Sequence, residues 1–206
     1  APQEVGAVQM GVRINNRLGS LLARMQDMEF VIFTEVFQRG RRRVRSVGMG
    51  GNAQFVRLSA RDALGPRHWT RSLTEDFDLG IRLNATSWTN EFWPSASVHQ
   101  QGVTNMRRLL RQRTRWFQGN LQALHLLRSV AREQRGLGRA DTLWQILTPY
   151  LLLTGSLLTL SFLITMVTAA VAAVLRWEQS WIWLVGAYVI AFGPALIYAW
   201  IYWRIE

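Results

Sequence analysis

Residues 111–120 read RQRTRWFQGN, in which three arginines and a glutamine are followed at once by tryptophan and phenylalanine. In a helix, Gln112, Arg115 and Trp116 share one face, because residues three and four positions apart are neighbours. Such a face offers a guanidinium for a phosphate, an amide for a further oxygen, and an indole for stacking on a sugar ring. The alternative is a basic amphipathic helix that lies on anionic lipid.

Two uncharged stretches follow, at residues 142–175 and 179–203. Each exceeds the roughly 20 apolar residues that cross a bilayer. Neither has a polar face that could meet water, which argues against a pair of buried core helices. We therefore predict two transmembrane helices, at about 149–175 and 180–203, within a membrane region 142–206.

The first of these stretches is too long for one simple span. A helix rises about 1.5 Å per residue, so the whole stretch would overshoot a hydrocarbon core of about 30 Å. Pro149 and Gly155 offer natural breaks in the helix. We expect residues 143–148 to lie at the membrane interface, ahead of the span itself.

Charge is spread unevenly along the chain. The formal net charge is +11, all 24 basic residues are arginine, and all but two of them precede position 141. The positive-inside rule then places residues 1–140 in the cytoplasm and the connection RWEQS outside, as in a multi-pass protein of the inner membrane. The absence of cysteine excludes disulfides and thiolate metal sites.

The part before the membrane region predicts an α/β class. VGAVQMGVRI, residues 5–14, is rich in valine and isoleucine and favours a strand, whereas residues 16–37 carry apolar side chains at helical spacing. RGRRRVRS, residues 39–46, is predicted to be a loop. Residues 48–65 then predict a glycine-rich turn, a short strand and a short helix that ends at Gly65 and Pro66.

The remaining elements are a helix over residues 72–86, a short strand over 89–94 (TNEFWP), and a long basic helix over about 104–134. Within the first of these, Ser72 and Glu75 fit a capping box, and three acidic residues in the first turn complement the helix dipole. The functional alternative is that one of these carboxylates faces a cleft and acts as a general base.

Two short motifs meet in this chain: Thr74-Glu75-Asp76, and further along Gln112-Arg113-Thr114-Arg115-Trp116 ahead of apolar helices. In this order they resemble the inverting family 2 glycosyltransferases, above all membrane-embedded ones such as cellulose, hyaluronan and poly-N-acetylglucosamine synthases. The resemblance implies the C-terminal half of a glycosyltransferase A-type domain (residues 1–103), basic interface helices (104–141), and two transmembrane helices.

The resemblance also implies roles for these residues. Asp76 would be the base that deprotonates the acceptor hydroxyl, and Glu75 would line the site beside it. Gln112 and Arg115 would hold the nucleotide diphosphate, and Trp116 would contact the acceptor sugar. The implied reaction is a single in-line displacement that inverts the anomeric configuration.

Three further positions follow from the same resemblance. Thr74 completes the acidic motif and is counted among the substrate-binding residues. GMGGNAQF falls where relatives place a small-residue loop near the acceptor terminus, which makes Gly50, Gly51 and Asn52 candidates. A plain tight turn would explain the glycines equally well. Gln9 matches a polar strand-end position of relatives, and no role is assigned to it.

The family binds its nucleotide and Mg²⁺ or Mn²⁺ through an N-terminal βαβ half with an Asp-x-Asp motif. We interpret this sequence as lacking that half together with its metal-binding motif. We therefore expect no metal ligands in this chain and no activity without the remainder of a parent polypeptide. The expected partners are a nucleotide-diphosphate sugar, a glycan or lipid acceptor, and membrane lipid. Nucleic acid is not expected, because RGRRRVRS lacks interleaved aromatic residues. The rival function is a non-catalytic polybasic membrane anchor.

Overall fold

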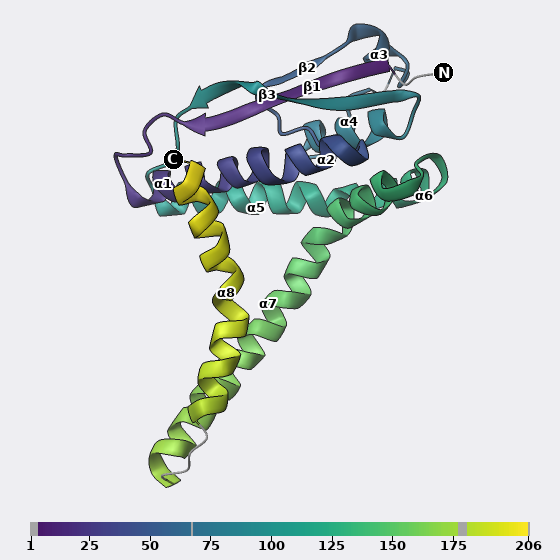
Figure 1. Cartoon of the computed structure of the whole chain (residues 1–206). Coiled ribbons are helices and arrows are strands. Elements are labelled where there is room, and N and C mark those ends of the chain that lie inside the picture. The colour runs from purple at the N-terminus through teal and green to yellow at the C-terminus, as the bar shows by residue number, and fades with distance from the viewer. Residues whose placement is uncertain (1–3, 67, 177–180, 206) are drawn as a thin grey trace. The chain divides into compact units, whose positions relative to one another are not determined.

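The computed structural model describes residues 4–66, 68–176 and 181–205. The chain forms two compact units, Ala1–Pro149 and Tyr150–Glu206, and each is described by itself. The first is a mixed α/β unit with one sheet and several helices (Figure 1). The second consists of helix. The predicted α/β class is confirmed for the first unit.

The sheet has three strands in the order β2-β1-β3. Its central strand, β1 (Glu4–Ile14), confirms the prediction for residues 5–14. It pairs antiparallel with β2 (Gln54–Val56) and parallel with β3 (Trp88–Gln100). The expected strand over 89–94 was too short, because the pairing with β1 resumes after an irregularity that contains Pro94. Proline has no N–H to donate, so a strand accommodates it where the ladder is already interrupted.

The first helical segment is longer than the sequence predicted. α1 (Leu21–Val31) is capped by Ser20 and continues as a π-helix (Ile32–Gln38) and as α2 (Arg39–Val44). The expectation of a loop over 39–46 is therefore wrong. Arginine is a good helix former, and the Nε of Arg41 donates to a carboxylate oxygen of Asp141 at 3.2 Å, which ties this helix to a distant part of the chain.

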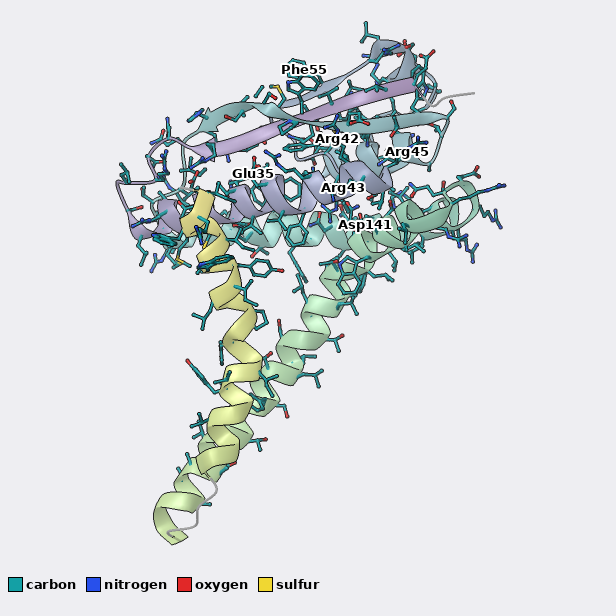
Figure 2. All side chains as sticks on the ribbon, viewed as in Figure 1. Glu35, Arg42, Arg43, Arg45, Phe55 and Asp141 are labelled. Carbon is teal, nitrogen blue, oxygen red and sulfur yellow. The ribbon has the colours of Figure 1, made fainter. Side chains whose placement is uncertain are left out.

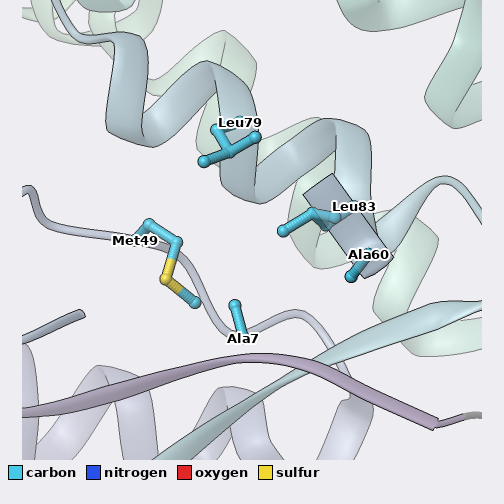
Figure 3. Close-up of a cluster of buried hydrophobic side chains, with 5 residues drawn as sticks. All are labelled: Ala7, Met49, Ala60, Leu79 and Leu83. Atoms are coloured by element: carbon cyan, nitrogen blue, oxygen red, sulfur yellow. The ribbon is translucent and has the colours of Figure 1, made fainter. Parts of the chain in front are cut away.

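After β2 come α3 (Leu58–Asp62) and α4 (Glu75–Asn84), as predicted. The capping box is wrong, because Thr74 is the N-cap residue of α4 and its side chain makes no capping bond. Figure 3 shows the core cluster that joins α3 and α4 to β1 and to the loop before β2. It consists of buried side chains from all four segments: Ala7, Met49, Ala60, Leu79 and Leu83.

The basic helical region is built from three pieces. α5 (Met106–Gln122) leads through a 3₁₀ turn (Ala123–Leu126) into α6 (Leu127–Glu133), so the predicted helix over 104–134 is confirmed apart from that turn. A second buried cluster packs these pieces against α4 and the start of the next helix. Its members are Ile81, Ala123, Leu126, Val130 and Ile146.

α7 (Gly136–Arg176) runs without interruption through Pro149 and Gly155, so the predicted break is wrong. In apolar surroundings a broken helix would leave backbone groups unpaired, which favours continuing through a proline. Residues 143–148 were expected to lie at the membrane interface. Within this segment Ile146 is fully buried and packs in the second core cluster of the first unit.

Among the described residues, one helical stretch, Gly136–Ala172, is long and apolar enough to cross a membrane. α8 (Trp181–Ile205) is helical where the second span is predicted. That it crosses a membrane stays a prediction. Of the connection RWEQS, residues 177–180 lie outside the described residues.

Candidate active site

The acidic motif lies beside the glycine-rich loop that precedes β2. Gly51 has a φ of +83°, a conformation that favours glycine. A Cβ at this position would stand 2.7 Å from Oδ2 of Asp76, so the loop approaches the carboxylate as closely as a residue without a side chain allows. Two of the residues predicted from sequence, Gly51 and Asp76, are therefore in contact.

Burial raises the pKa of Asp76 above its usual value, and the neighbouring charge of Glu75 adds to the effect. The backbone N–H groups of Phe77 and of Asp76 itself, together with the charge of Arg115, oppose the rise. A carboxylate whose pKa moves towards neutral pH is a stronger base. Of these contributions the charge of Arg115 is the smallest.

A close approach of two backbones brings α5 to the acidic motif. A Cβ on Gly119 would lie 2.7 Å from the backbone N, Oγ1 and Cγ2 of Thr74, so only glycine fits here. Nearby, the N–H of Leu73 donates to Oε1 of Gln122 at 3.0 Å. Gly119 lies one turn beyond Arg115, and this contact therefore sets the position of Arg115 relative to Asp76.

A small open cavity of about 70 Å³ lies on the other side of the glycine-rich loop. It is lined by α1, the loop, the end of β3 with the segment that follows it, and α5. The lining residues are Gln26, Phe30, Gly50, Asn52, Gln100, Gln101, Val103, Gln112 and Trp116. Among these described residues none is charged, five carry amides and two are aromatic. Such a surface suits hydroxyl groups better than phosphate.

The predicted site residues thus fall into two adjoining groups. Gln112, Trp116, Gly50 and Asn52 line the cavity, whereas Asp76 is not among its lining residues. The loop joins the groups, because Gly50 and Asn52 face the cavity and the residue between them contacts Asp76.

Trp116 is held by neighbours on two sides. The guanidinium of Arg113 lies over the indole at 4.4 Å and forms an ion pair with Glu29 at 2.6 Å. Phe30 packs against the same indole edge to face, with ring centroids 6.5 Å apart. Arg113 therefore covers part of the indole, and less of it faces a sugar than the sequence suggested.

Two of the predicted residues have other surroundings. Glu75 is exposed, and Thr74 is buried against Gly119. Thr74 therefore lies where it positions α5, and it is not among the residues that line the cavity.

Sequence reasoning missed the side chains that hold the loop. Gln9 is fully buried, and its Nε2 donates to the carbonyls of Met10 and Asn52, both at 2.9 Å. Its Oε1 accepts the N–H of Gly50 at 2.9 Å. One amide thus fixes both ends of the segment that contacts Asp76. The sequence suggested a polar position at the end of a strand, whereas Gln9 lies in the middle of β1.

Three further buried amides hold the start of the same loop. Gln38 exchanges two hydrogen bonds with Gly48, at 2.7 Å from its Nε2 and 3.2 Å to its Oε1. Asn84 and Asn90 both donate to the carbonyl of Val47, at 3.0 and 3.1 Å. Because backbone groups that are not in a helix or sheet still need partners when buried, these amides let an irregular segment lie in the core.

With this geometry in view, the comparisons with known proteins are decisive for the family. The sequence profile described as "Glycosyl transferase family group 2" matches residues 1–201. The chain belongs to this family. The narrower likeness to cellulose and hyaluronan synthases has no such support.

Three relatives show which members of the family this chain is similar to. The chain is 33% identical over 163 residues to a beta-monoglucosyldiacylglycerol synthase of Trichormus variabilis, which covers 75% of this chain and 33% of that protein. It is 34% identical over 119 residues to the synthase of the same name from Synechocystis, covering 57% and 24%. A probable glycosyltransferase of Bacillus subtilis is 31% identical over 120 residues, covering 57% and 28%. The matched region thus spans about a third of these relatives or less.

Enzymes of this glycosyltransferase family commonly use a divalent metal. Over residues 4–66, 68–176 and 181–205, no three side chains of the metal-binding types gather closely enough to hold an ion.

Proposed function

We propose that this chain supplies the acceptor side of an inverting glycosyltransferase. The enzyme moves a sugar from a nucleotide-diphosphate sugar to a glycan or lipid acceptor at the cytoplasmic face of the membrane. The observation that carries the proposal is the contact of Gly51 with Asp76 beside a cavity lined by neutral amides and aromatic rings, with Arg115 one turn before the contact of Gly119 with Thr74. A general base, a cation and a site for hydroxyl groups are what this transfer needs.

In the proposed reaction the acceptor oxygen attacks the anomeric carbon of the donor sugar. Asp76 takes the proton of that hydroxyl as the new C–O bond forms. The bond between the anomeric carbon and the diphosphate breaks, the nucleoside diphosphate leaves with its electron pair, and the configuration inverts. Arg115 would stabilise the charge that builds on the leaving phosphates, which is where a fixed cation is most effective. The sequence motif also implied a phosphate contact for Gln112, but Gln112 lines the uncharged cavity, where it would bind a hydroxyl group.

A lipid acceptor is favoured over a glycan. The relatives from Trichormus variabilis and Synechocystis are named as synthases of a glucosyl diacylglycerol, and this product requires a neutral hydroxyl as the acceptor. The cavity beside Trp116 has no charged residue in its described lining and suits a neutral hydroxyl of either acceptor, so the preference for lipid rests on these relatives. The sugar that is transferred is not assigned.

The proposal includes the organisation expected from sequence. Residues 1–103 form the C-terminal part of a glycosyltransferase A-type domain, residues 104–141 lie at the membrane surface, and residues 142–206 provide two spans. The nucleotide pocket and any Mg²⁺ or Mn²⁺ ligands belong to the remainder of the parent polypeptide.

The test is incorporation of radiolabelled sugar from nucleotide sugars into lipid and glycan fractions, using membranes that contain the parent polypeptide. Asp76→Asn keeps the size of the side chain and removes its basicity, so incorporation should fall by about 10²- to 10⁴-fold. The matched control is Glu75→Gln, which neutralises the adjacent, exposed carboxylate and should reduce the rate far less. Equal incorporation by wild type and Asp76→Asn would reject Asp76 as the base.

The polybasic anchor remains a second candidate, because Arg107, Arg108 and Arg111 are all exposed on α5. It predicts that Gln112→Leu and Trp116→Leu, which keep every charge, leave function intact. The enzyme proposal predicts that both variants lower incorporation of sugar while the protein stays in the membrane fraction.

A further inference from the structure

Asp141, near the start of α7, is the point at which three segments of the chain meet. Its Oδ2 accepts hydrogen bonds from Nε of Arg41 at 3.2 Å, from the hydroxyl of Ser46 at 2.7 Å and from Nε2 of Gln145 at 2.7 Å. Arg41 belongs to α2, Ser46 begins the loop that carries Gly51, and Gln145 lies one turn farther along α7. Figure 2 shows Asp141 beside the arginines at the end of α2. One carboxylate therefore joins α2, the loop and α7.

Gln145 makes a second connection between α7 and the loop. Its Nε2 also donates to the carbonyl of Ser46 at 3.0 Å, and a Cβ on Gly48 would stand 3.1 Å from its Oε1. Ser46 and Gln145 are both buried. Because a buried polar group that loses its partner is not compensated by water, these bonds constrain the start of the loop strongly.

The first turn of α7 also meets the end of α2 directly. A Cβ on Gly138 would collide with the carbonyl oxygen of Val44, so only glycine fits at this approach. α2 ends at Arg45, which has a left-handed conformation with a φ of +60°, and the N–H of Ser46 donates back to the carbonyl of Arg41 at 3.1 Å. α7 therefore holds the turn that directs the chain into the loop.

The path from this turn to the acidic motif is short and closely packed. Ser46 precedes Gly51, which contacts Asp76, by five positions. Between them, the side chains of Val47 and Met49 are buried. Close-packed interiors transmit a displacement because they contain little free space to absorb it. A shift of Ser46 should therefore change the contact between Gly51 and Asp76.

We propose that Asp141 is a positioning residue for the transfer reaction, because it fixes the start of the loop whose Gly51 contacts Asp76. The inference rests on the proposed function. Asp141 is not among the residues that line the cavity, so its effect passes through Ser46 and the loop. The first turns of α7 then belong to the catalytic unit.

A rival role for Asp141 is to support α2 alone. The side chain of Arg41 is only 15% exposed. Burial lowers the pKa of Arg41, and the charge of Asp141 opposes that change. Both roles use the same carboxylate, so the test must separate its bond to Ser46 from its ion pair with Arg41.

Ser46→Ala and Arg41→Met make this separation in the parent polypeptide. Ser46→Ala removes the hydroxyl and leaves the ion pair, and it should lower kcat for sugar transfer several-fold with KM nearly unchanged. Arg41→Met leaves the hydroxyl bond, and it should lower stability while kcat stays near that of wild type. Wild-type kcat in Ser46→Ala would overturn the proposal, as would a loss in Arg41→Met equal to that in Asp141→Leu.

A conservative variant and a matched control complete the series. Asp141→Asn retains one oxygen that can accept the hydroxyl of Ser46, so it should keep more activity than Asp141→Leu. The control is Asp62→Leu, because Asp62 is also paired with an arginine, Arg61 at 2.8 Å, but is exposed on α3. It should change neither kcat nor KM. Equal activity in Asp141→Asn and Asp141→Leu would contradict a role through the bond to Ser46.

The pH dependence of kcat distinguishes positioning from a general loss of stability. Burial raises the pKa of Asp76, and the loop contributes to that burial through Gly51. If the loop withdraws, the carboxylate becomes more exposed and its pKa falls. The acid limb of the kcat profile should therefore move to lower pH in Ser46→Ala and Asp141→Leu. A lower kcat with an acid limb in its original place would overturn the proposal.

Hydrogen–deuterium exchange of the full chain in detergent tests the coupling without catalysis. The N–H groups of Gly48 and Gly50 donate to Gln38 and Gln9 at 3.2 and 2.9 Å. They should exchange several-fold faster in Ser46→Ala and Asp141→Leu than in wild type or Asp62→Leu. Unchanged exchange would overturn the coupling. Faster exchange together with no transfer by the wild-type parent polypeptide would support the coupling and count against the proposed function alone.

Discussion

The two walls of the candidate site, the glycine-rich loop and the helix α5, are built in opposite ways. The loop from Ser46 to Ala53 has no regular structure, yet buried amides from β1, the π-helix, α4 and β3 bond its backbone. Gln145 of α7 adds a bond to the carbonyl of Ser46 at 3.0 Å. α5 is a regular helix that satisfies its own backbone, and it meets the fold mainly along Gly119 and its contacts with α1.

The comparison shows how each wall keeps its position. The loop depends on a few specific hydrogen bonds, each of which leaves unpaired groups in the core when its partner is lost. The helix depends on shape, because its backbone passes within contact distance of Thr74. Replacing one of the buried amides should therefore destabilise the loop, whereas adding a methyl group at Gly119 should displace α5.

The largest effect on stability should come from Gln9→Leu. This variant keeps the approximate size of the side chain but leaves the N–H of Gly50 and the carbonyl of Asn52 unpaired. Each buried group without a partner costs about 1–3 kcal/mol, so a loss of about 3 kcal/mol or more in the free energy of unfolding is expected. Chemical unfolding in detergent, followed by tryptophan fluorescence, measures it. The exposed Gln118→Leu on α5 is the control, and a similar small change in both variants would contradict the role of Gln9.

A smaller loss, about 1–3 kcal/mol, is expected for Gly119→Ala, which places a methyl group against the backbone of Thr74. The helix must shift, and Arg115 shifts with it, so sugar transfer by the parent polypeptide should fall more than stability does. The control is Gly40→Ala on α2, where a Cβ meets nothing within 4 Å. It should be neutral or slightly stabilising, since alanine is the better helix former. Full activity in Gly119→Ala would show that α5 tolerates displacement.

Gly51→Ala sharpens the comparison, because it changes the loop without removing any of its hydrogen bonds. A left-handed conformation costs an alanine about 1–2 kcal/mol, and the new methyl group would press on Oδ2 of Asp76. The expected result is modest destabilisation with a strong loss of kcat. Gly65→Ala is the control: Gly65 has a similar φ of +79°, with open space around it. If both variants lose the same activity, the contact with Asp76 is not what matters.

The sequence predicted the helix more readily than the loop, for physical reasons. The α5 stretch carries its own periodicity, and β1 is a local run of β-branched residues. α2 was missed because its helix is supported by the pairing of Arg41 with Asp141, which is distant in the sequence. Figure 2 labels Asp141 and the α2 residues Arg42 and Arg43. The length of β3 beyond Pro94 depends on its pairing with β1.

The site shows the same division. Asp76, Gln112, Arg115 and Trp116 were found because short motifs carry them, and their roles stay proposals. Gln38, Asn84 and Asn90 were not found, because a glutamine or asparagine that is buried and bonded to a loop has the same letter as one on the surface. Burial of an amide is decided by tertiary structure, which a single sequence does not reveal.

The smallest expected effect concerns Asp76 itself and links the two walls. Burial between the loop and α5 raises the pKa of Asp76, so its ionised form weakens the folded state at neutral pH. Asp76→Asn should therefore raise the thermal unfolding temperature at neutral pH although it strongly lowers sugar transfer. As the pH falls through the raised pKa and then the unfolded value, wild type becomes neutral in both states and the difference should vanish. Glu75→Gln is the control, and a gain of equal size there, or one that persists in acid, would mean that relief of burial at Asp76 is not the cause.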